Sequence, residues 1–306
     1  MKAYSKSFPI AMVLAICVAT VASQDEEPQL RQYLAGRANP HASLERAFNA
    51  MYDLDFAHAD AETAQFITEH PDDPTGPAVQ AASVLFAIFE RHKVLQSQLF
   101  ASDENYRKRD AIVPDNLSVQ QFESALRQAE GQARKALSNN SANQEALFAL
   151  TLVHGLRADY AALIERHDFA ALRFSNAGTA WARKLLASSP EAYDAYVAIG
   201  IQKYLVSLRS APVRWMLRLG GINGDQGQAL EELQMAADKG RYLGPFARTL
   251  LTVAYLRSNH KMEALQLLAG LHQQFPHNPL FSQEIDRIEQ SESGQPAAGG
   301  SFEAQQ

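Results

Sequence analysis

The sequence predicts an all-α fold in which helices pack as antiparallel pairs, and three observations lead to this prediction. From Leu44 onward, apolar residues recur at spacings of three and four, which places them on one face of a helix. No segment shows sustained alternation of apolar and polar residues with β-branched side chains, the pattern of a half-buried strand. Gly and Pro are few and mostly fall between the apolar-periodic stretches, as in a helical protein.

The first 23 residues have the three-part pattern of a secretory signal peptide. Lys2 and Lys6 form a basic start, Ile10 to Ala22 is an apolar run, and small residues at 21–23 precede an acidic stretch. The apolar run is too short to span a bilayer comfortably, and a buried N-terminal helix is the less favoured alternative. We therefore expect an exported protein, periplasmic or secreted, whose mature chain starts near Gln24.

Cys17 is the only cysteine of the chain. A lipoprotein signal normally has a small residue before its cysteine, and the branched Ile16 disfavours that alternative. If the signal peptide is removed, the mature chain has no cysteine and cannot form disulfides in an oxidising compartment. Its stability then has to come from packing.

The mature chain divides into three parts by composition. Residues 24–43 are polar and contain proline, so they are expected to form a linker. Residues 44–288 carry the helical pattern, including one apolar stripe from Ala81 through His92 to Leu99 that predicts a long helix. Residues 289–306, rich in Gly, Ser and Gln, are expected to form a disordered tail.

Several stretches of the helical part are similar to one another and resemble the tetratricopeptide repeat, a helix-turn-helix unit of 34 residues. The stretch Leu250–Pro276 has apolar and small residues at that family's spacings, and Tyr196–Gly200 is similar to the aromatic-x-x-aliphatic-Gly start of its first helix. Further matches begin at Phe56, Ala129 and Ala229. The resemblance covers 44–288 and implies a right-handed superhelical array of antiparallel helix pairs, that is, an α-solenoid scaffold.

The second half also resembles a eukaryotic tetratricopeptide family linked to the mitochondrial outer membrane and inclusion bodies. The residues that carry this likeness are the stretch 224–240, the helix around Tyr255 and the run Phe275–Phe281. This resemblance implies a scaffold protein with no catalytic activity.

Nothing in the residue pattern points to catalysis, a metal or a cofactor. The nine histidines form no His-Glu-x-x-His or other ligand pair, and His154 occupies an aromatic packing position of a repeat. The glycine cluster at 220–224 lacks the Lys-Ser/Thr of a phosphate loop, so a helix end explains it better. The formal charge of −6 gives no indication of nucleic acid as a partner. An enzyme with an unrecognised site is therefore the least favoured hypothesis.

The segment 205–219 interleaves three arginines with large apolar residues. Such a segment is typical of a helix at a membrane surface or a partner surface, although Pro212 interrupts it. It supports an alternative hypothesis, an envelope or membrane-associated assembly factor, while a long repeat helix ending in a bend would look the same.

The leading hypothesis is a scaffold that binds a protein or peptide through its concave surface. The resemblance implies a groove lined by nine residues that are mostly apolar: Glu145, Phe148, Leu152, Val197, Ile201, Tyr204, Thr249, Val253 and Leu256. Repeat domains of this family that grip a C-terminal carboxylate use Lys, Arg and Asn there, so we expect an apolar or helical segment as the ligand. The competing expectation is that the protein's own helices fill the concave face.

Overall fold

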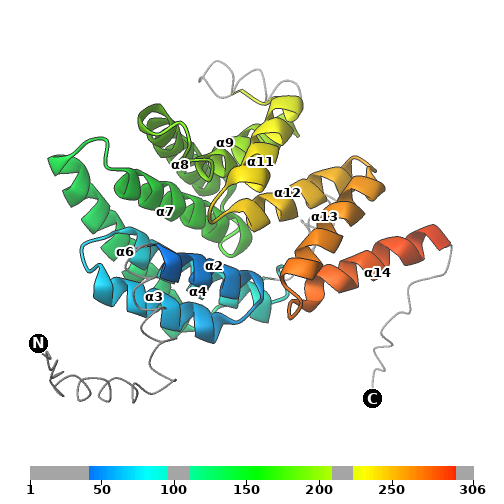
Figure 1. Cartoon of the computed structure of the whole chain (residues 1–306), viewed down its shortest axis with the longest axis horizontal. Coiled ribbons are helices and arrows are strands. Elements are labelled where there is room, and N and C mark those ends of the chain that lie inside the picture. The colour runs from blue at the N-terminus through cyan, green and yellow to red at the C-terminus, as the bar shows by residue number, and fades with distance from the viewer. Residues whose placement is uncertain (1–40, 96–110, 209–222, 294–306) are drawn as a thin grey trace, which may run out of the picture. The chain divides into compact units, whose positions relative to one another are not determined.

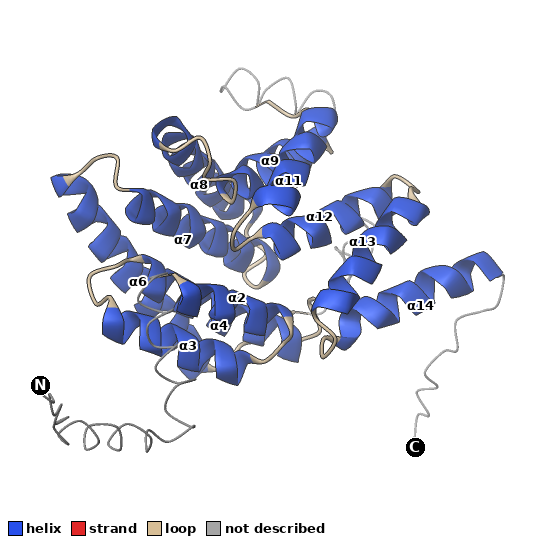
Figure 2. Cartoon of the chain, viewed as in Figure 1, coloured by secondary structure: helices blue, strands red, loops and turns tan. Residues whose placement is uncertain are grey.

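The computed structural model describes residues 41–95, 111–208 and 223–293, and every regular element within these ranges is an α-helix (Figures 1 and 2). This confirms the predicted all-α class. From Ser43 on, the helices belong to one compact unit. The predicted signal peptide, the segments 96–110 and 209–222 and the tail from 294 lie outside the described residues. The helices are α2 (Ala42–Tyr52), α3 (Phe56–Glu69), α4 (Thr75–Arg91), α6 (Asn116–Asn139), α7 (Gln144–Leu163), α8 (Asp168–Ser188), α9 (Ala195–Ser207), α11 (Gln226–Lys239), α12 (Gly244–Arg257), α13 (Lys261–Gln274) and α14 (Pro279–Ser293).

Helices that follow one another in the chain pack against each other. From α3 to α14, each helix packs closely with the next described helix, and α7 also packs with α4 and α9 (Figure 1). Short connections of a few residues favour such neighbouring, antiparallel arrangements. The largest cluster of buried apolar residues extends from α2 to the start of α12, a second joins α13 and α14, and a third lies between α9, α11 and α12.

Small residues allow the closest of these helix contacts. Gly200 of α9 faces α11, and a Cβ atom at this position would lie 2.8 Å from Cγ of Leu233 and 3.1 Å from the carbonyl oxygen of Ala229. On α13, Ala264 is completely buried. These are the positions at which the sequence predicts small residues between paired helices.

Four helices begin at an Asp or Asn that caps the first turn. The side chains of Asp55, Asp115, Asn143 and Asp225 each accept a hydrogen bond from the backbone N–H three residues later, at 2.7–3.0 Å. Each such cap satisfies one of the N–H groups that a helix start leaves without a partner. The sequence signals helix starts clearly for this reason.

Helix ends are harder to predict, because several end on a left-handed residue other than glycine. Leu54, Lys93 and Asn259 have φ values of 62°, 56° and 60°. After each of them, the next backbone N–H donates to a carbonyl five residues back, as in a Schellman cap. Glycine usually takes this position, since other residues are strained there.

This capping corrects one prediction about α4. The stripe from Ala81 to Leu99 predicted a helix that continues through His92, but α4 ends at Arg91 and the next residues form a turn. His92 is exposed instead of contributing to the core. At the other end of the fold, α14 continues to Ser293, beyond the predicted boundary at 288.

Candidate functional site

The nine predicted groove residues fall into two groups. Phe148, Leu152, Val197 and Tyr204 are buried, with exposed fractions below 10%. Glu145, Ile201, Thr249, Val253 and Leu256 remain partly accessible. Two of the groove residues on α7 and two on α9 are therefore covered, whereas the three on α12 are more open.

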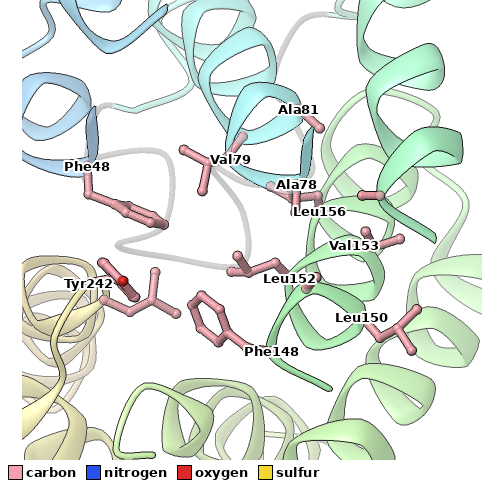
Figure 3. Close-up of a cluster of buried hydrophobic side chains, with 14 of the residues drawn as sticks. Phe48, Ala78, Val79, Ala81, Phe148, Leu150, Leu152, Val153, Leu156 and Tyr242 are labelled. Atoms are coloured by element: carbon pink, nitrogen blue, oxygen red, sulfur yellow. The ribbon is translucent and has the colours of Figure 1, made fainter. Parts of the chain in front are cut away.

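The cover over Phe148 comes from distant parts of the chain. Tyr242, in the connection between α11 and α12, lies between Phe48 of α2 and Phe148 of α7, and the three rings point toward one another (Figure 3). The ring centroids are 5.1 and 5.6 Å apart, and the planes are inclined by 27° and 29°. Offset stacking of this kind adds to the hydrophobic gain of burying the rings. The protein's own residues thus cover this part of the predicted groove.

A buried carboxylate fixes the backbone around Tyr242. Asp194 accepts hydrogen bonds from the N–H groups of Arg241, Tyr242 and Leu243 at 3.1, 3.0 and 2.7 Å. Burial raises the pKa of Asp194, and the three N–H donors act against that rise. The turn needs Gly240, because a Cβ atom there would lie 2.8 Å from Oδ1 of Asp194.

Tyr52 at the end of α2 joins two connections that are remote in sequence. Its hydroxyl donates to the carbonyl of Tyr242 at 2.9 Å, and its own carbonyl accepts from Nδ2 of Asn278 at 2.8 Å. Its ring also packs against Phe275, with centroids 5.5 Å apart. Desolvation raises the pKa of Tyr52 above its ordinary value, so the residue acts as a neutral donor.

The open part of the predicted groove is an apolar stripe on two helices. Ile201 and Leu205 of α9 and Leu208, the residue directly after it, are four and three residues apart and so lie on one face, and Leu205 and Leu208 are 49% and 40% exposed. Thr249, Val253 and Leu256 follow the same spacing on α12. Both helices pack against α11. We call these six residues the α9–α12 stripe.

One carboxyl group lies in register with the predicted groove face of α7. Asp159 is seven residues after Leu152, so it falls on the same face of the helix. Desolvation raises its pKa to about 7, while the side chain keeps partial access to solvent. With a pKa of about 7, this carboxyl group changes its charge near neutral pH.

His154 has the packing role that the sequence predicts. Its ring stacks on Phe174 of α8 with centroids 6.3 Å apart, and burial lowers its pKa. Arg157 beside it lies within ion-pair distance of Glu123 and Glu130 of α6 and over the ring of Phe174. This group therefore joins α6, α7 and α8.

Within the described ranges, no group of three or more His, Cys, Asp or Glu side chains is arranged to hold a metal ion. None of the described helices has the length and apolar character needed to cross a bilayer. Neither protein-family models nor curated proteins nor solved structures match this chain.

The sequence analysis missed four residues that join segments far apart in the chain: Tyr52, Asp194, Tyr242 and Asn278. A single Asp or Asn beside a helix end carries no signal for the distant loop that it binds. The run Gly240–Pro245 offered one usable signal, since it places two large apolar residues in a tight glycine-bounded turn, where they need a partner to be buried.

Proposed function

We propose that this protein is an exported, tetratricopeptide-like solenoid scaffold that binds a protein partner and performs no catalysis. The succession of helices packed on their chain neighbours supports the solenoid part of the proposal. The close contact at Gly200 and the buried Ala264 support it as well, because that repeat family places small residues where paired helices meet. Export rests on the residue pattern of the first 23 residues.

The α9–α12 stripe is the observation that carries the binding proposal. Leu205 and Leu208 are exposed, and Ile201, Val253 and Leu256 are partly exposed at helical spacing; exposed apolar patches on soluble proteins usually mark interaction sites. The charged side chains of Lys203 on α9 and Glu232 on α11 already form an ion pair with each other. The stripe therefore favours an apolar ligand over a charged one.

The ligand that fits such a stripe is the apolar face of an amphipathic helix. Such a helix places its anchors at i, i+3, i+4 and i+7, and the three residues on or directly after α9 and the three on α12 offer it apolar contacts on two helices that both pack against α11. The carboxylate-binding mode remains disfavoured, because none of the nine predicted groove residues is Lys, Arg or Asn.

A capture experiment with matched variants tests this function. The immobilised protein, from Gln24 to its end, is incubated with envelope extract and compared with a Leu205→Ser/Val253→Ser variant. A Met262→Ser variant is the control, since Met262 is a 71% exposed apolar residue on α13, outside the stripe. We expect one enriched protein that the control retains and the stripe variant loses. Equal capture by all three proteins would contradict the stripe, and enrichment of lipid alone would favour the membrane-associated alternative.

A further inference from the structure

Most of the helices that pack closely in this fold are neighbours in the sequence. Within the described residues, every closely packed helix pair that involves α3 or α4 has its partner among α3, α4, α6 and α7. Every such pair that involves α11 to α14 has its partner among α9 and α11 to α14. No close helix pair in these ranges joins α2–α4 to α11–α14. In addition, α2 is the only described helix that packs closely along no other described helix.

Side chains nevertheless join these two parts of the fold. Three aromatic contacts cross between them: Phe48 with Tyr242, Tyr52 with Phe275, and Phe86 of α4 with Phe246 of α12. The last pair meets edge to face, with centroids 6.0 Å apart and planes inclined by 84°. We call the contacts between α2–α4 and residues 241–278 the seam.

Polar groups surround the aromatic contacts of the seam. Arg241 forms an ion pair with Glu45 of α2, and His277 binds Asp53 through both its backbone N–H and its ring, at 2.9 and 2.6 Å. Both pairs have solvent access on at least one side. Exposed ion pairs of this kind add little to the free energy of unfolding. Their main effect is therefore to align the two sides of the seam.

We propose that the seam is a closing contact that opens while the rest of the fold stays intact. A protein whose helices pack on their chain neighbours keeps those contacts when its two ends separate, and the two helix pairs that are not chain neighbours, α4 with α7 and α7 with α9, do not cross the seam. Opening then requires the loss of side-chain contacts and a few hydrogen bonds, and no helix pair has to be broken. Such sub-global openings lie below global unfolding in free energy.

The open form would uncover an aromatic surface that the closed form hides. When Phe48 leaves, Tyr242 loses one stacking partner and becomes accessible on that side, while its ring stays on Phe148, one of the predicted groove residues. The seam then acts as an autoinhibitory contact: α2 occupies the place that an apolar partner would take. This extension rests on the proposed binding function, because only a binding scaffold has a use for the uncovered surface.

Hydrogen–deuterium exchange of the protein without any partner tests the seam directly. We expect α2 and residues 240–243 and 275–278 to exchange together, at least about tenfold faster than α7 and α8. The opposite result, exchange of α2 only at the rate of global unfolding, would overturn the proposal. Exchange of α2 alone, with 240–243 and 275–278 still protected, would also overturn it, since that pattern describes fraying of one helix.

A matched pair of variants separates seam opening from general destabilisation. Phe48→Leu weakens a seam stack, and Phe122→Leu weakens a comparable stack between Phe122 and Tyr160 of two chain-neighbour helices, with centroids 5.1 Å apart. We expect Phe48→Leu to accelerate exchange at 240–243 and leave α7 and α8 unchanged. Phe122→Leu should accelerate exchange in α6 and α7 and leave the seam unchanged. Uniform acceleration by both variants would overturn the proposal.

A covalent lock provides the reverse test. Asp53 and His277 contact each other across the seam, so the Asp53→Cys/His277→Cys variant is oxidised and disulfide formation is confirmed by mass spectrometry before exchange is measured. Oxidation should suppress the fast exchange of α2, and reductant should restore it. Unchanged exchange in the oxidised form would contradict the proposal. None of these tests uses a partner, so their outcome is independent of the capture experiment.

Discussion

Tyr52 donates a hydrogen bond to the carbonyl oxygen of Tyr242 at 2.9 Å, although 190 residues of chain separate them. This bond places the end of α2 against the connection between α11 and α12. It explains why residues predicted to line an open groove near the start of α7 are buried, since the same connection places the Tyr242 ring on Phe148.

Replacing Tyr52 by Phe should lower the free energy of unfolding by about 1 kcal/mol, the usual net contribution of such a hydrogen bond. The ring and its contact with Phe275 are kept, so the change isolates the hydroxyl. Urea denaturation measures the effect, and Tyr255→Phe on the partly accessible face of α12 serves as the control. Equal effects of the two substitutions would show that the Tyr52 hydroxyl does not stabilise the closed form.

Gly200→Ala should destabilise the protein by about 1–3 kcal/mol, because the added methyl group overlaps Leu233 on α11. Gly131→Ala is the matched control: Gly131 lies within α6 and nothing approaches its Cβ position within 4 Å. That substitution should stabilise α6 by about 0.5–1 kcal/mol, since alanine favours helix more than glycine does. Thermal unfolding of both variants distinguishes them, and changes of the same sign would contradict the predicted contact.

Ala264→Leu should cost about 1–3 kcal/mol by overpacking the contact between α12 and α13, where Ala264 is completely buried. The control is Ala269→Leu, an exposed position on the same helix, which should have little effect. An unchanged melting temperature for Ala264→Leu would mean that the helix contact is looser than the structure shows.

The stability of the protein should fall as the pH rises from about 4 to about 7, because of Asp159. Desolvation raises the pKa of this side chain from 3.8 to about 7. Between these values the folded protein binds more protons than the unfolded chain, so raising the pH favours unfolding. Because the side chain keeps partial solvent access, we expect the free energy of unfolding to fall by about 1 kcal/mol, which is less than the whole pKa difference between the folded and unfolded states would give.

Asp159→Asn should remove this dependence. The variant is expected to melt about 2–4 °C higher than the unchanged protein at pH 8, and at nearly the same temperature at pH 4. Calorimetry at the two pH values provides the comparison. A shift of equal size at both values would show that charge on Asp159 is not the cause.

Local sequence patterns predicted the helices well, because their signals are short-range. Apolar spacing places the helical faces, and Asp115, Asn143 and Asp225 mark helix starts through a bond three residues away. The end of α4 was not predicted because Lys93 takes the left-handed conformation there. Glycine usually occupies that position after a helix, and its absence removed the usual sequence signal. The packing role of His154 was predicted correctly, since repeat spacing is also a local signal.

The covered part of the candidate site could not be predicted, because it depends on contacts between segments far apart in the chain. Nothing near Phe148 in the sequence indicates that Tyr242 and Phe48 lie on it. Nothing near Asp194 indicates that its carboxylate holds the turn at 241–243. Ile201 and Val253 stay partly accessible because no distant segment among the described residues buries them fully.

Site-specific photo-crosslinking at Leu205 tests the central claim, partner binding through the α9–α12 stripe, most directly. A photoreactive amino acid replaces Leu205 in one variant and Met262 in the control, and both are irradiated in envelope extract. If the stripe binds the partner, we expect one discrete protein adduct at position 205 and none at position 262. The adduct should be lost when Val253→Ser is added. Lipid adducts alone, or the same adducts from both positions, would contradict the claim.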